Sequence, residues 1–190
     1  MSDFVHLSQV HSGPNVLVVH PATPYKTVAD VVDFAKKNPG KLDYGFTHAA
    51  SGHMAMELFK QTAGIELTGI PYKGGGPMLI DLLAGVIPTM FINQDAALAH
   101  VRSGKMRAIA VSSAARNPLY PDVPTISESG YKGFEALSWS GMSVAKGTRL
   151  IASGKRTGGG AKTFFAEGRI TDDEGTLVAT ATGVFRYRGK

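Results

Sequence analysis

The chain has 190 residues, 43% hydrophobic and 18% charged, which suits a globular protein of one ordinary domain or two small ones. No apolar run approaches the roughly 20 residues that a membrane-spanning helix needs, and the absence of cysteine excludes disulfides and thiolate chemistry. The net charge of +5 is concentrated in the tail, because residues 1–148 hold 12 Lys/Arg against 11 Asp/Glu and residues 149–190 hold 8 against 4. No basic cluster is interleaved with aromatic side chains, so no nucleic-acid partner is expected.

The opening residues Met1–Phe4 have neither a basic stretch nor an apolar stretch, so they do not form a secretory signal. Expressed as given, the chain is therefore expected to stay in the cytoplasm. If its relatives are exported, the export signal is expected to be missing here.

Strand and helix patterns alternate over residues 1–148. Asn15–His20 is a continuous apolar run, as expected of a strand buried on both faces. Thr27 with Asp30 has the spacing of a capping box that opens a helix, and Thr125 with Glu128 repeats it before a short helix. This alternation predicts an α/β fold with a mainly parallel sheet, in which ligands bind beyond the carboxyl ends of the strands. Further strands are expected over 42–46, 67–72, 88–92 and 107–112, and further helices from Ser51, Pro77 and Asp95.

The pattern changes after Lys146. Residues 164–170 and 176–187 alternate like strands, with Asp172–Gly175 as the turn between them, and Gly158–Gly160 forms a flexible break. We therefore expect two domains, 1–148 and 149–190, the second an antiparallel β-hairpin. An isolated hairpin is marginally stable in water, and its exposed edges favour pairing with a second copy, which makes the chain a candidate homo-oligomer.

Several motifs agree in order and spacing with one known family. Together they resemble the substrate-binding proteins of tripartite tricarboxylate transporters, the Bug or TctC family, over about residues 3–148. The motifs are Pro71–Pro77, Asp81–Gly85, Met90–Phe91, Gly104–Val111 and Pro121–Thr125, with further matches at Asn15–Pro21, Asn38–Leu42 and Glu57–Phe59.

The resemblance implies a periplasmic solute-binding protein that is not an enzyme and uses no cofactor. Its fold would be two-lobed, with the lobes closing on a small carboxylate, and its partner would be the membrane permease of the transporter. Residues 15–110 would form most of one lobe, and the second lobe would be incomplete.

Three departures from the family pattern suggest a truncated chain. The opening segment of the family, with a Pro/Gly-rich loop on the opposite wall of the cleft, has no counterpart. The loop Phe46–His53 is poorer in glycine and one residue shorter than usual in the family. The C-terminal helices of the family are replaced.

The replacement has a likeness of its own. Residues 151–188, through Ala166–Ile170 and Asp172–Arg186, resemble the last two strands of a hotdog-fold acyl-CoA thioesterase. The catalytic constellation of that family has no visible counterpart, so the chain would be a fusion of two incomplete domains. The alternatives to a binding protein are thus a thioesterase remnant or an inactive oligomeric fragment.

The glycine triplet Gly74–Gly76 is the first candidate for a carboxylate site. Backbone N–H groups at a helix N-terminus bind anions, and glycine lets the backbone approach a ligand closely. We expect the amides around Gly74 and Gly75 to bind one carboxylate; the alternative is a tight strand-to-helix turn.

Polar residues at the ends of other strands complete the predicted site. Thr47 and Ser51 carry hydroxyls that would either donate to a carboxylate or cap the following helix. Asn93 and Gln94 would either contact the ligand or cap a turn, and Tyr72 would pack against either the ligand or the sheet. Lys73 is more readily explained as a solvated side chain.

Two other kinds of site are disfavoured. His48, His53 and Asp95 lack the paired spacing of metal ligands, so no metal is expected. Ser51 and His53 are two apart and do not face each other on a helix, so they are not expected to form a nucleophile and base. Trp139 is expected to pack where the chain crosses between lobes.

Overall fold

The protein is described by a computed structural model that covers residues 4–145, 149–159 and 163–186. The chain forms two compact units, one of Gln9–Gly141 and one of Met1–Ser8 with Met142–Lys190. The division into domains 1–148 and 149–190 stays a prediction. The elements are β1 (Phe4–Val19), α1 (Val28–Lys37), β2 (Asp43–Thr47), α2 (Ser51–Ala63), β3 (Thr68–Tyr72), α3 (Gly75–Leu83), β4 (Thr89–Asn93), α4 (Gln94–Arg102), β5 (Arg107–Val111), β6 (Leu137–Ala145), β7 (Leu150–Gly159), β8 (Thr163–Asp172) and β9 (Leu177–Arg186).

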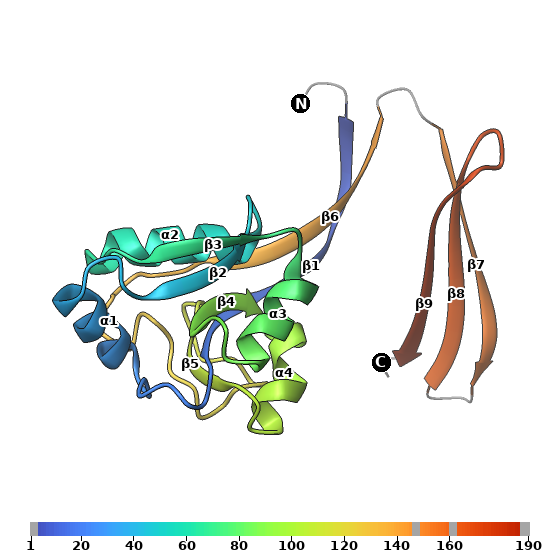
Figure 1. The fold of residues 1–190 in the computed structure, drawn as a ribbon. Helices are drawn as coiled ribbons and strands as arrows, with labels where there is room; N and C mark the ends of the chain where they lie inside the picture. Colours follow the sequence, from blue (N-terminus) through green and yellow to red (C-terminus); the bar gives the residue numbers. More distant parts are fainter. Residues whose placement is uncertain (1–3, 146–148, 160–162, 187–190) are drawn as a thin grey trace. The chain divides into compact units, whose positions relative to one another are not determined.

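The larger unit is built on a mixed sheet in the order β3-β2-β4-β1-β5, with β6 also paired to β1 (Figure 1). Strand β2 runs parallel to β3 and β4, whereas β1 runs antiparallel to β4 and β5. The prediction of an α/β fold with mainly parallel strands is confirmed, with β1 as the exception. Because β1 is reversed, Asn15 pairs with Asn93 at the edge where β2, β3 and β4 end.

Helices cover both faces of this sheet. The buried residues of α1 and α2 form one apolar cluster with Leu17 and Val19, and those of α3 and α4 form another with Val16 and Val18. These four β1 residues are fully buried, which confirms the prediction from their continuous apolar run.

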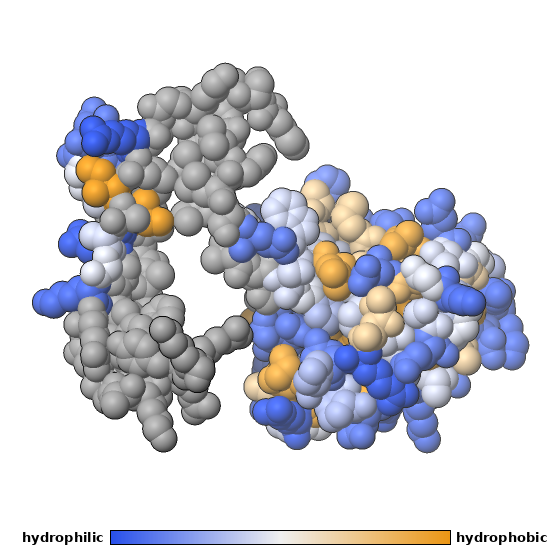
Figure 2. All heavy atoms as spheres, turned by 180° about the vertical axis from the view of Figure 1, so that it is seen from behind, coloured by the Kyte–Doolittle hydropathy of each residue, from blue (hydrophilic) through white to orange (hydrophobic). Residues whose placement is uncertain are grey.

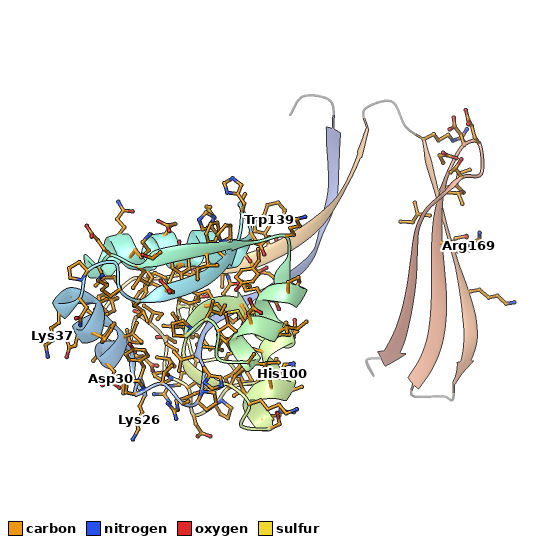
Figure 3. All side chains as sticks on the ribbon, in the orientation of Figure 1. Lys26, Asp30, Lys37, His100, Trp139 and Arg169 are labelled. Atoms are coloured by element: carbon orange, nitrogen blue, oxygen red, sulfur yellow. The ribbon has the colours of Figure 1, made fainter. Side chains whose placement is uncertain are left out.

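Helix starts follow the predicted capping chemistry in part. In the capping box of α1, the Thr27 hydroxyl accepts from the Asp30 N–H at 3.2 Å and the Asp30 carboxylate accepts from the Thr27 N–H at 2.8 Å. The predicted start of α3 at Pro77 is wrong by two residues, because the helix begins at Gly75. The start of α4 is also earlier than predicted, because Asn93, not Asp95, caps it. Figure 3 shows Lys26 and Asp30 near one end of α1 and Lys37 at the other.

The capping box predicted at Thr125 forms, but no helix follows it. The Glu128 carboxylate accepts from the Thr125 N–H at 2.8 Å, and the Thr125 hydroxyl accepts from the Glu128 N–H at 2.9 Å. Residues 126–130 nevertheless form turns. Gly130 has φ +106°, a backbone conformation that a right-handed helix cannot contain.

Trp139 does not pack as predicted. Its side chain is 70% exposed and projects from β6 (Figure 3). The buried aromatic of this region is Phe134, whose ring lies 6.2 Å from that of Phe59 in an edge contact. Polar side chains dominate the face of the larger unit seen in Figure 2, with apolar side chains between them.

The second unit contains a three-stranded antiparallel sheet in the order β7-β8-β9. The predicted hairpin is confirmed as β8 and β9; in its turn, Asp172 Oδ1 accepts from the N–H groups of Glu174 and Thr176. Strand β7 was not expected, and the predicted break is wrong at Gly158 and Gly159, which pair with β8. A register shift after Arg156 lets this glycine segment stay in the sheet. Gly160 and Tyr187 lie outside the described residues.

No helix in the described part of the chain is long and apolar enough to cross a membrane.

Candidate functional site

A cavity of about 410 Å³ lies at the edge of the sheet where β2 and β4 end and where α2 and α3 begin. Parallel strands bring their carboxyl ends to one edge, as in other α/β ligand sites. The lining residues are Asn15, Phe46, Thr47, Ala50, Ser51, Gly52, His53, Gly75, Gly76, Met78, Leu79, Phe91, Ile92, Asn93 and Ala96.

The first turn of α2 forms one side of the cavity. Ala50 is its N-cap, and within the described residues no side chain caps the helix. A Cβ at Gly52 would lie 2.4 Å from the Phe91 carbonyl oxygen, so glycine is required for α2 to begin this close to β4. The first N–H groups of α2 are thus held beside the cavity without a side-chain acceptor.

The first turn of α3 forms the facing side. Its N-cap is Gly74, again without a side-chain cap among the described residues. A Cβ at Gly75 or Gly76 would meet no described atom within 4 Å, so packing does not require glycine there. Both glycines line the cavity and leave space for a ligand beside the helix N-terminus, whereas Gly74 lies outside the lining.

Thr47 ends β2 at the cavity wall. Its hydroxyl oxygen is buried and has no hydrogen-bond partner in the described part of the chain. It does not cap α2, so the capping alternative for Thr47 is not observed. A buried hydroxyl without a partner costs about 1–3 kcal/mol and indicates a missing partner such as a ligand or a water.

Ser51 does not cap α2 either. Its hydroxyl donates to Oδ1 of Asn15 at 3.2 Å. Asn15 is 1% exposed, and its Nδ2 donates to the Ala136 carbonyl at 3.3 Å. The Asn15 N–H donates to Ser112 Oγ at 2.8 Å, and that hydroxyl donates to Ala136 O at 2.6 Å. Ser51 is therefore held in place by a network that joins β1, the residue directly after β5 and the segment before β6.

Asn15 is not among the predicted site residues. A parallel β1 would place it at the opposite edge of the sheet, and only the antiparallel pairing with β4 brings it to the cavity. The sequence signal that could have identified Asn15 is its position as a polar residue at the start of the apolar run Asn15–His20.

Asn93 lines the cavity, whereas Gln94 lies outside its lining. Asn93 Oδ1 accepts from the Asp95 N–H at 3.1 Å, so the capping alternative is observed. The Nδ2 group of Asn93 is the part of its side chain that can donate to a ligand. Gln94 is 9% exposed, and its side chain accepts from Asn117. Its carbonyl accepts from the Tyr120 hydroxyl at 2.6 Å. Burial raises the pKa of Tyr120 to about 12, so this hydroxyl stays protonated as a donor.

Tyr72 also lies outside the lining. Its hydroxyl donates to Asp81 Oδ2 at 2.6 Å, and its ring packs against the cluster of α3 and α4. Burial, followed by the hydrogen bond to Asp81, raises the pKa of Tyr72 to about 12. These contacts match the interpretation that Tyr72 packs against the sheet. Lys73 is exposed and outside the lining.

The rest of the lining is mainly apolar. Phe46 and His53 stack with ring centroids 4.3 Å apart, and His53 Nδ1 accepts from the Ala49 N–H at 3.3 Å. Of the described residues that line the cavity, none is Lys, Arg, Asp or Glu. Groups of three or more metal-ligating side chains are likewise absent from the described residues. The described lining of the cavity thus combines neutral hydrogen-bonding groups with apolar side chains.

Helices on both faces of a mainly parallel sheet, with a cavity at the carboxyl edge, define a lobe of the periplasmic-binding-protein kind. The sequence pattern of the family described as "Tripartite tricarboxylate transporter family receptor", TctC, matches residues 1–158. The chain belongs to this family. The match to TctC gives no support to the resemblance of the tail to a hotdog-fold thioesterase.

Known proteins agree with this assignment. BugT of Bordetella pertussis is 37% identical over 149 residues, which are 78% of this chain and 46% of BugT. The structure of R. palustris Rpa4515 with adipate has 36% identity and a TM-score of 0.73, over 76% of this chain and 49% of Rpa4515. The periplasmic binding protein BugD has 33% identity and a TM-score of 0.72, over 76% of this chain and 48% of BugD.

MatC from Rhodopseudomonas palustris with bound malate has 25% identity and a TM-score of 0.72, over 76% of this chain and 49% of MatC. The chain therefore spans about half the length of the relatives it matches. BugD is a periplasmic binding protein, and the structures of Rpa4515 and MatC contain adipate and malate, which are small dicarboxylates.

Proposed function

We propose that this chain captures a small carboxylate in the cavity between α2 and α3, as the ligand-binding part of a receptor for a tripartite tricarboxylate transporter. Its role is binding and release, not catalysis. Its place of action is the periplasm, and its partner is the transporter's membrane permease, as expected for this family.

The observation that carries the proposal is the set of unused donors at one cavity. Helices α2 and α3 begin there without side-chain caps among the described residues. Thr47, whose buried hydroxyl has no described partner, lines the same cavity. The N-terminus of a helix carries roughly +0.5 of an elementary charge, so two of them suit one carboxylate.

The residues that we propose to contact the ligand are those predicted residues that line the cavity: Thr47, Ser51, Gly75 and Asn93. Adipate and malate, which are bound by Rpa4515 and MatC, are the natural first ligands to test. Of the other predicted residues, Gly74 sets the start of α3, while Tyr72 and Gln94 brace neighbouring segments.

The proposal also extends to assembly. Strands β7 and β9 are the outer strands of the three-stranded sheet, and outer strands pair readily with another chain. We propose that a second copy adds to this sheet. Light scattering should then give the mass of a dimer or larger oligomer, and a monomer over a wide concentration range would contradict this part.

Ala50→Asp tests the site directly. An aspartate at the N-cap accepts from the first N–H groups of α2, so it should stabilise the helix by about 1 kcal/mol and compete with a bound carboxylate. The readouts are thermal unfolding and calorimetric titration with adipate, malate and aromatic acids.

Thr62→Asp is the matched control, because Thr62 is exposed near the other end of the same helix. It adds the same charge away from the cavity and should leave carboxylate affinity unchanged. If the folded wild-type chain binds no acid in a broad panel, the proposed function is wrong.

A further inference from the structure

The hydrogen bonds of Asn15 have a polarity that is set by backbone atoms. The Asn15 N–H can only donate, and it donates to Ser112 Oγ at 2.8 Å, so the Ser112 hydroxyl directs its own proton to the Ala136 carbonyl at 2.6 Å. That carbonyl can only accept, and it also accepts from Asn15 Nδ2 at 3.3 Å. These backbone groups therefore decide which side-chain atoms of the network donate and which accept.

The same polarity fixes the orientation of the Asn15 amide. Turning the amide over would bring Oδ1 against the Ala136 carbonyl oxygen, where neither oxygen has a proton to donate. With Nδ2 on Ala136, Oδ1 faces Ser51 and accepts from its hydroxyl at 3.2 Å. Asn15 is 1% exposed, so withdrawing the Ser51 proton would leave a buried oxygen unsatisfied, which is costly.

The Ser51 hydroxyl consequently offers lone pairs, not a proton, to the cavity that it lines. Its proton is held by Asn15, and no described residue donates to its oxygen. Thr47 differs, because its hydroxyl has no partner among the described residues and keeps its proton for a carboxylate. The two hydroxyls of this lining thus have opposite roles: Thr47 suits an acceptor on the ligand, and Ser51 suits a donor.

Resting on the carboxylate-binding function proposed above, we propose that Asn15 is a specificity-determining residue. Acting through Ser51, it makes the cavity favour an acid that carries a hydroxyl group over the same acid without one. Ser51 is the first residue of α2, whose uncapped N-terminus carries a partial positive charge, so a neutral hydroxyl suits this position better than an ammonium group. An acid without the hydroxyl still binds through the backbone donors, so the effect is on relative affinity.

Calorimetric titration of the full chain with malate and succinate, which differ by one hydroxyl, measures this effect. Malate should bind about two- to tenfold more tightly, the range that one neutral hydrogen bond gives. Equal affinities, or tighter binding of succinate, overturn the proposal, and tighter binding of aspartate than of malate overturns the choice of a hydroxyl. No binding of any acid to folded protein instead overturns the carboxylate-binding function itself.

Ser51→Ala distinguishes an acceptor from a donor at this position. Loss of an acceptor should weaken malate binding about two- to tenfold and leave succinate binding unchanged. An equal loss for both acids would show that Ser51 donates to the carboxylate, which overturns the proposal.

Asn15→Leu tests whether Asn15 sets this role. Leucine has a similar size and lacks the acceptor, so the Ser51 proton becomes free to donate to a carboxylate; succinate should bind roughly tenfold more tightly, and the two affinities should become nearly equal. A malate preference that persists in this variant overturns the role of Asn15. If the variant does not fold, the result with Ser51→Ala decides the proposal.

Thr89→Val is the matched control for loss of a buried hydrogen bond. The Thr89 hydroxyl donates to the Val18 carbonyl at 2.8 Å, and Thr89 lies outside the lining. This variant should keep the malate preference of the wild type. If it lowers that preference as much as Asn15→Leu does, the preference reflects general stability and the proposal is wrong.

Discussion

Replacing Thr47 by valine tests two effects of its hydroxyl separately: the effect on the stability of the free protein and the effect on carboxylate affinity. Valine keeps the shape of the side chain and removes the buried oxygen that has no partner among the described residues. An unsatisfied buried hydroxyl costs about 1–3 kcal/mol, and Thr47 is only partly buried, so a gain of about 1 kcal/mol is expected. For a chain of 190 residues this raises Tm by about 2–4 °C.

Thr89 is the matched control, because it lies on the neighbouring strand β4 and its hydroxyl has a partner. Its Oγ1 donates to the Val18 carbonyl at 2.8 Å, and the residue is 0% exposed. Thr89→Val leaves that buried carbonyl with one bond fewer and should lower Tm by about as much as Thr47→Val raises it.

Binding should respond in the opposite sense to stability. A hydrogen bond to a charged group contributes about 1.5–3 kcal/mol, so Thr47→Val should weaken carboxylate binding by roughly 10- to 150-fold. Differential scanning calorimetry and isothermal titration measure the two effects on the same samples. If Thr47→Val lowers Tm as Thr89→Val does, the hydroxyl has a partner in the free protein; if affinity is unchanged, the hydroxyl does not contact the ligand.

Two further perturbations test the local structure around the site. Gly52→Ala should destabilise the chain by about 2 kcal/mol or more, because the new Cβ would lie 2.4 Å from the Phe91 carbonyl oxygen. Gly75→Ala should change Tm little and weaken carboxylate binding. If thermal unfolding gives equal Tm changes for the two variants, α2 does not approach β4 this closely. The backbone hydrogen bond from Thr125 holds the pKa of Glu128 below its usual value of 4.5, so the stability it adds is present above about pH 4.5 and is lost as pH falls through the lowered pKa. The Tm difference between wild type and Glu128→Gln should therefore shrink from about pH 6 to about pH 3, and a difference that stays constant would contradict this assignment.

Much of the larger unit follows from local sequence signals. The apolar run before His20 predicts a strand buried on both faces, and its four valine and leucine residues are fully buried. The spacing of Thr27 and Asp30 predicts the start of α1 with its capping box. These features depend on residues a few positions apart, so periodicity and capping chemistry suffice to predict them.

Four of the seven predicted site residues line the cavity, and they too follow from such signals. Thr47, Ser51, Gly75 and Asn93 each end a strand or open a helix, and parallel strands bring such positions to one edge. Which of their atoms remain free for a ligand does not follow, because that depends on partners elsewhere, such as Asn15 for the Ser51 hydroxyl.

The sequence by itself determined the alternation of strands and helices, the capped start of α1 and the strand ends that could meet a ligand. Only the tertiary structure decided the direction of β1, which brings Asn15 to the cavity, and the pairing of β7, which takes Gly158 into a sheet. It also decided that Trp139 is exposed while Phe134 fills the core. The physical reason is that strand direction, pairing and burial are set by contacts between residues far apart in the chain, which no local pattern encodes.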